Sequence, residues 1–141
     1  MIAVAIVKRR LREGKTYDDF RHAWYHGTGF GAANRMFTLL NVADPREIVV
    51  IGLTETSLED AARLIAVDAA ERAGTPLDAV VEPTIDRTFG ILVAEDDFSA
   101  RGPIPYREAA VGGRRTDGGA VNDALTEARE LLKPYLRAQG E

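Results

Sequence analysis

Hydrophobic and polar positions along the 141-residue chain alternate in a way that predicts several strands. Residues 2–7 form a short apolar run rich in β-branched side chains, which is typical of a strand. Residues 9–14 then turn polar and end at a glycine, which marks the exit from this strand. Two further strand-like runs, 36–42 and 47–54, are separated by an Asp-Pro turn sequence and therefore predict a hairpin.

Two segments carry the signals of amphipathic helices. Residues 16–19 have the spacing of a capping box, with Asp19 in place of the usual glutamate. This helix weakens at the three alternating glycines of residues 27–31, which favour non-helical torsions. Residues 57–60 cap a second helix, whose apolar side chains share one stripe until a glycine and a proline end it.

A last strand-like run at residues 85–95 completes the order β-α-β-β-α-β. The predicted fold is α+β and ferredoxin-like, with the first and third strands at the centre of a four-stranded antiparallel sheet and both helices on one face. Residues 1–141 are predicted to form a single domain. It consists of a core at 1–99, a loop at 100–120 and an amphipathic C-terminal helix at 121–137.

The predicted strands are apolar on both faces, although the helices cover only one of them. A second copy of the chain is the simplest cover for the other face and would make an isologous homodimer. The alternative cover is the chain from residue 101 onward, folded back over its own sheet. In the first strand the two faces carry Ala3, Ala5 and Val7 against Ile2, Val4 and Ile6.

Charge and composition narrow the classes of partner. The formal net charge is -4 and acidic residues are interspersed with basic ones, so the chain has no basic field for a phosphate backbone and nucleic acid is not expected. The short basic runs at 8–12 and 114–115 are interpreted as solvated surface.

The chain contains no cysteine, which excludes disulfides, thiolate metal sites and cysteine nucleophiles. No apolar run is long enough for a signal peptide or a membrane span, so a cytoplasmic address without a membrane partner is expected.

The chemically most distinctive segment, residues 20–31, holds the only tryptophan and both histidines. On an undistorted helix Trp24 faces the core, or lines a cavity between helix and sheet, while His22 and His26 face water. His26 lies where the helix should unravel, so it could swing inward as a catalytic acid or base, and Tyr25 could donate a phenolic proton to a substrate. No third ligand accompanies the two histidines, so no metal site is expected.

Polar residues near the ends of strands are further candidates. Asp86 and Arg87 are adjacent and point to opposite faces of a strand; an inward Arg87 would anchor a substrate carboxylate or phenolate, and an inward Asp86 would act as a base. Asn34 could orient a substrate carbonyl, and Tyr106 lies in a proline-rich segment that could act as a lid. A rim position or a salt bridge explains Asp86 and Arg87 as well, and Tyr106 could equally be a simple anchor of its loop.

The order of elements, with Phe20 and Trp24 in the first helix, resembles the EthD-like and antibiotic-biosynthesis monooxygenase-like branches of the dimeric α/β-barrel superfamily. EthD-like sequences place a histidine one turn beyond this tryptophan, where this chain has Thr28, and His26 comes two residues after it instead. The resemblance implies a dimeric α/β barrel, with a cavity for aromatic or polyketide-like molecules in each subunit.

Together these features predict a small enzyme that acts on an apolar, aromatic or polyketide-like metabolite in a cavity between sheet and helices. The resemblance implies cofactor-independent oxygenation or cyclisation as the reaction class. The alternative is a non-catalytic homodimer that binds a small ligand or assists another enzyme. No cofactor is expected, and haem binding stays open because it needs only an inward axial ligand.

Overall fold

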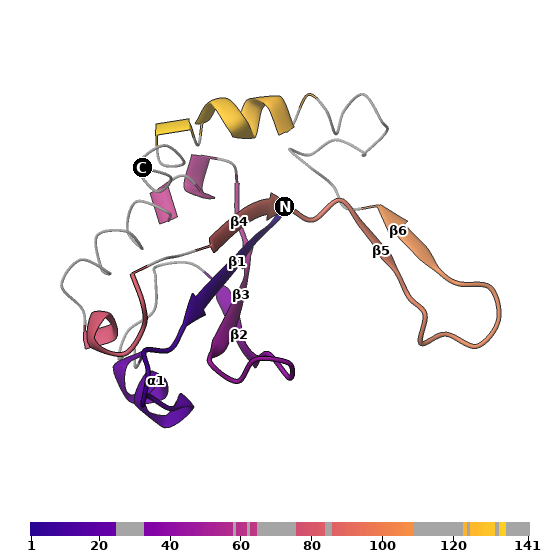
Figure 1. The fold of residues 1–141 in the computed structure, drawn as a ribbon. Coiled ribbons are helices and arrows are strands. Elements are labelled where there is room, and N and C mark those ends of the chain that lie inside the picture. The colour runs from indigo at the N-terminus through magenta and orange to yellow at the C-terminus, as the bar shows by residue number, and fades with distance from the viewer. Residues whose placement is uncertain are drawn as a thin grey trace.

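A computed structural model describes residues 1–24, 33–57, 59–61, 63–64, 76–83, 86–108, 123, 125–131 and 133–134. Its main sheet has four antiparallel strands in the order β2-β3-β1-β4 (Figure 1). They are β1 (Ile2–Arg10), β2 (Asn34–Leu40), β3 (Glu47–Glu55) and β4 (Asp86–Ile91). The prediction of an antiparallel α+β sheet with the first and third strands at its centre is therefore confirmed, and the arrangement is compatible with a ferredoxin-like fold.

Helix α1 (Tyr17–Ala23) begins at the predicted capping box. The Thr16 hydroxyl accepts a hydrogen bond from the Asp19 backbone N–H, and an Asp19 carboxylate oxygen accepts one from the Thr16 backbone N–H at 2.8 Å. These bonds satisfy two backbone donors at the start of the helix. The aromatic face also forms as predicted, because Phe20 is buried while His22 is exposed.

The remaining helical segments are short in the described part of the chain. Residues 59–61, 63 and 64 are helical, and the Ser57 hydroxyl caps them by accepting a hydrogen bond from Asp60 N–H at 3.2 Å. A 3-10 helix, η1 (Pro76–Ala79), lies on the same side of the sheet as α1 (Figure 1). Described residues between 123 and 134 are helical, as expected for the C-terminal segment, and Ala128 among them is buried.

The core lies between the sheet and these helices. It joins the end of β1 and the middle of β3 to α1 and to the segment around η1, with Ala23 and Trp24 packed against it. The residues of this cluster are Leu11, Phe20, Ile48, Val50, Leu77, Val80 and Val81.

The sheet has two faces with different burial. Pairing of β1 with β3 and β4 puts Val7 beside Val50 and Arg87, so these residues share the side that packs on the core, called here the helix-facing side. On this side β1 and β3 bury most of the alternate residues, namely Ala3, Val7, Arg9, Ile48, Val50 and Gly52, while Ala5 and Thr54 are half-buried.

The opposite face carries the intervening residues, most of them apolar and none fully buried. In β1 and β3 these are Ile2, Val4, Ile6, Val49, Ile51 and Leu53, all of them half-buried. On the neighbouring strand β2, Phe37 is 41% exposed and Leu39 is 48% exposed. The expectation of apolar side chains on both faces of the sheet is confirmed.

Beyond the sheet the structure differs from the sequence prediction. The strand expected at 85–95 is divided into β4 and β5 (Ala94–Asp96), and β5 pairs with β6 (Tyr106–Glu108), which lies within the predicted loop of 100–120. The division has a simple cause: Ala3 pairs with Ile91 and the Ile2 carbonyl accepts from Leu92 N–H, so β1 offers no further partner. The chain leaves the sheet and pairs with itself in a hairpin that projects away from it (Figure 1).

Candidate functional site

Arg87 is the predicted site residue whose position is most informative about a binding site. It lies opposite Val7 on the helix-facing side, and its Nε atom is buried without a hydrogen-bond partner in the described part of the chain. A buried guanidinium nitrogen without an acceptor is costly, because burial removes its water and nothing in the protein replaces that water. Of the two adjacent candidates, Arg87 is therefore the one on the helix-facing side.

Asp86 lies on the other side of the sheet. It is exposed and pairs in register with Lys8 on the opposite face. Successive side chains of a strand alternate between the two faces, so Asp86 and Arg87 do not meet in one site. The two residues point to opposite faces, as the sequence predicted, and only Arg87 is on the helix-facing side.

Arg9 is a residue that the sequence analysis placed on the surface and the structure buries. Its exposed fraction is 8%, since β1 continues to Arg10 instead of ending near Val7. Position 9 continues the alternation of Ala3, Ala5 and Val7, and this alternation is the signal that could have identified Arg9 from the sequence. The interpretation of residues 8–12 as solvated surface is thus wrong at this position.

Small side chains accompany these arginines on the helix-facing side. Ala5 pairs with Gly52 on one flank and with Phe89 on the other. Gly90 does not join them, because it pairs with Val4 on the opposite face, where a Cβ atom would meet nothing within 4 Å.

Asn34 lies at the far corner of the helix-facing side, paired with Thr54. Its Oδ1 atom is buried and receives no hydrogen bond within the part of the chain that the structure describes. Asn34 on β2 is separated from Arg87 on β4 by three inter-strand spacings across the sheet and by four residues along the strands. In an ideal sheet these offsets correspond to a distance of about 20 Å. A small ligand at Arg87 therefore does not reach Asn34.

Trp24 belongs to the packing of the core. Its ring stacks on Phe20 with 5.9 Å between centroids and an interplanar angle of 10°, and it lies against the cluster that contains Ile48. Ile48 pairs in register with Arg9, so Trp24 lies against the same end of the sheet. His22 is exposed, with Nδ1 2.7 Å from the Asp18 carbonyl oxygen. Tyr25 and His26 lie outside the described residues.

Tyr106 begins strand β6 of the projecting hairpin and is 59% exposed. The hairpin is held by its own contacts: Asp97 N–H donates to the Pro105 carbonyl at 2.9 Å, and Ser99 N–H donates to the Asp97 carboxylate at 3.0 Å. Figure 1 shows the hairpin projecting away from the sheet, so Tyr106 does not accompany Arg87 there.

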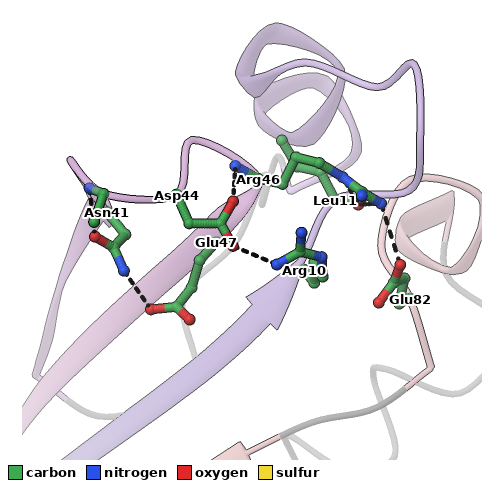
Figure 2. Close-up of polar contacts among 8 residues, drawn as sticks. Arg10, Leu11, Asn41, Asp44, Arg46, Glu47 and Glu82 are labelled. Atoms are coloured by element: carbon green, nitrogen blue, oxygen red, sulfur yellow. Dashed lines mark hydrogen bonds and ion pairs between the residues drawn. The ribbon is translucent and has the colours of Figure 1, made fainter.

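A polar network surrounds the β2–β3 turn (Figure 2). Arg10 pairs with Asp44, and Arg46 donates both to the Leu11 carbonyl and to the Glu82 carboxylate, the latter at 3.2 Å. Hydrogen bonding from Arg10, followed by that from the Arg46 backbone, lowers the pKa of Asp44 below its ordinary value. These groups satisfy one another, so we assign the network to fold stability.

Protein-family models, curated proteins and solved structures were all compared with this chain, and none of them matches it. The resemblance to dimeric α/β-barrel proteins therefore stays a prediction, while the strand order of the sheet is compatible with a ferredoxin-like fold. Among the described residues, no helix has both the length and the apolar character needed to span a membrane.

Proposed function

We propose that this chain binds a small apolar metabolite against the helix-facing side of its sheet, with a polar group of the ligand held by Arg87. The observation that carries the proposal is the buried Nε atom of Arg87, which finds no acceptor among the described residues. A ligand oxygen would supply that acceptor and remove the cost of burying the donor.

The surroundings of Arg87 favour an apolar ligand body. Val7 lies directly opposite it on β1, and Phe89 follows it on the same side of β4. Ala5 and Gly52 extend this surface with small side chains. One polar anchor on a mostly apolar surface is the usual composition of a site for small molecules.

Binding is the function that the described geometry supports best, because the expected catalytic groups are not assembled in it. Asp86 faces away from Arg87, and His26 lies outside the described residues. Oxygenation or cyclisation of the bound metabolite is the enzymatic extension of this proposal. Detection of a new product by mass spectrometry, after incubation with a bound compound in air, would establish it.

A thermal-shift screen of aromatic and acyl compounds against the wild-type chain tests the proposal. A ligand present at 100 times its Kd stabilises the native state by about 2.7 kcal/mol and raises the Tm accordingly. Ala5→Leu should abolish the shift, since it adds bulk to the helix-facing side, whereas Val4→Leu on the opposite face should retain it. A shift that both variants retain would contradict this location of the site.

The proposal includes a homodimer formed through the opposite face of the sheet. The centre of this face carries only apolar or uncharged side chains, while its charged residues lie toward the ends of the strands. A two-fold axis through this centre would place the apolar side chains of the two copies against each other, and the three basic and three acidic rim residues add no net charge to the interface. The charged residues are Lys8, Arg10, Arg35, Glu47, Glu55 and Asp86.

A further inference from the structure

From the direction of the β5–β6 hairpin and the charges on the opposite face of the sheet we infer that this hairpin, residues 94–108, contacts a second copy of the chain near Arg35. The inference rests on the homodimer of the proposed function and specifies how the two copies are oriented. It gives a role to the hairpin, which takes no part in the ligand site at Arg87.

The hairpin is held in shape by its own contacts while it exposes apolar side chains. Phe98 is 79% exposed, and Ile104 and Tyr106 are exposed as well. In the part of the chain that the structure describes, β5 and β6 pair only with each other. Figure 1 shows the hairpin reaching away from the sheet on the side opposite to α1. Exposed apolar groups gathered on one element indicate an interaction site, and a second copy on the opposite face lies within reach of this one.

The charges at the two ends of β3 determine how the copies stack. Sheets that pack face to face keep their strands nearly aligned, so the two-fold axis runs either along the strands or across them. An axis across the strands lays β3 on its own copy in the reverse direction and brings Glu47 against Glu55 of the second copy. An axis along the strands lays β3 on β1 and brings Glu47 against Arg10. Because like charges in an interface are costly and opposite charges attract, the axis along the strands is favoured.

The same axis places β4 of one copy over β2 of the other. Gly90 and Arg35 both lie level with the paired residues Val4 and Leu53, so Arg35 meets Gly90 of the second copy. A Cβ atom at Gly90 would meet nothing within 4 Å, so the long Arg35 side chain has room there. Strand β4 ends one residue later, at Ile91, and the chain then enters the hairpin. The hairpin of one copy therefore leaves its sheet beside Arg35 of the other.

The hairpin and the surface around Arg35 are chemically complementary. Asp96 and Tyr106 are cross-strand partners, so their side chains lie on the same face of the hairpin, and both are exposed. A carboxylate and a phenol ring together suit a guanidinium group, through an ion pair and a cation–π contact. Arg35 is the only charged residue of β2, is exposed, and lies over the Phe37 ring at 5.2 Å from its centroid. An acidic and aromatic surface on the hairpin thus matches a basic and aromatic surface on β2.

Charge reversal in the full chain tests the contact, with association measured by sedimentation equilibrium over a range of concentrations. Asp96→Arg and Arg35→Asp should each weaken dimerisation about 10-fold, and the two together should restore it to within about 3-fold of the wild type. Asp78→Arg, on the exposed surface of η1, is the matched control and should leave dimerisation unchanged. A dimer that tolerates both single variants would overturn the inference alone. A wild-type chain that is monomeric throughout would overturn the proposed homodimer with it.

Cross-linking tests the orientation independently, since the chain has no cysteine of its own. Arg35→Cys combined with Gly90→Cys should be joined between copies by a short bismaleimide, because packed sheets lie about 10 Å apart and the two positions face each other. Arg35→Cys combined with Leu39→Cys is the pair that an axis across the strands would join. A denaturing gel separates the covalent dimer from the monomer. Covalent dimers from the second pair and not from the first would overturn the inference.

Discussion

Arg46 donates two hydrogen bonds to the backbone carbonyl of Leu11, from Nε at 3.1 Å and from Nη2 at 2.8 Å. In return, Leu11 N–H donates to the Arg46 carbonyl at 2.7 Å. The chain leaving β1 is thereby fixed to the β2–β3 turn, and the same guanidinium reaches Glu82 on the segment that follows η1 (Figure 2). One side chain thus connects three segments that are distant in the sequence.

Replacement of this side chain by Arg46→Met should lower the free energy of unfolding by about 1–2 kcal/mol. The expected loss is moderate because the guanidinium is partly solvated in the native state. Urea denaturation followed by circular dichroism measures it. Arg107→Met on the exposed hairpin is the control and should change stability by less than about 0.5 kcal/mol. Equal losses in the two variants would contradict the role assigned to Arg46.

Acid should weaken the fold partly through Asp44, whose pKa is lowered by hydrogen bonding from Arg10 and from the Arg46 backbone. A carboxyl group with a lowered native pKa binds fewer protons in the native state than in the unfolded state. Its stabilising contribution is therefore present above the ordinary pKa of about 4 and is lost as the pH falls through the native value.

Unfolding free energies of the wild type and of Asp44→Asn, measured from pH 6 down to pH 2, test this linkage. The variant should be less stable near pH 6, and the difference should narrow on acidification. The pKa values of Asp19 and Asp97 are also lowered, chiefly by hydrogen bonds from Thr16 and Ser99 respectively, so both proteins keep some acid sensitivity. A difference that stays constant with pH would rule out the contribution of Asp44.

Two glycines should respond in opposite ways to alanine. Gly14 has a φ of 78°, in the region that a side chain disfavours, so Gly14→Ala should destabilise the protein by about 1–2 kcal/mol. Gly52 lies in an ordinary strand, and an added Cβ would lie 3.7 Å from Asn34 Oδ1, an ordinary van der Waals contact. Gly52→Ala should therefore leave stability unchanged or raise it by up to about 1 kcal/mol, as measured by urea denaturation.

The homodimer can be tested through the centre of the opposite face. Ile51→Lys places an ammonium group among apolar residues that a second copy is proposed to cover, so it should weaken association by at least about 10-fold. Light scattering coupled to gel filtration, over a range of concentrations, measures this effect. Ala79→Lys, on the exposed surface of η1, should leave association unchanged. A wild-type chain that is monomeric at every concentration would exclude the dimer.

The elements that sequence predicted best are those whose signals are local. The capping box at Thr16 and Asp19 uses backbone groups within four residues, and the aromatic stripe of α1 depends only on helical spacing. The strand order could also be predicted from the sequence. Strands joined by a short hairpin are neighbours and crossover connections are right-handed, and these two rules leave few arrangements for the order β-α-β-β-α-β.

Two features could not be predicted from the sequence, the end of β4 and the burial of Arg9, because both depend on how far a partner strand extends. The exit of β4 at Ile91 is set by the start of β1 at Ile2, a contact between segments about 90 residues apart. The burial of Arg9 has a related cause, since β1 continues in register with β3 as far as Glu47. The basic run at residues 8–12 suggested a solvated surface. In the sheet, however, successive side chains of this run alternate between the two faces.

That alternation in β1 also determines which genetic changes this strand can tolerate. Odd-numbered positions, ending at Arg9, face the core, and even-numbered positions face the other way. Substitution at one position alters one face, but insertion or deletion of a single codon within β1 would exchange the two sets beyond that point. An insertion before Lys8, for example, would bring Lys8 into the interior in place of Arg9. Among natural or selected variants of this gene, length changes in β1 should be far rarer than substitutions.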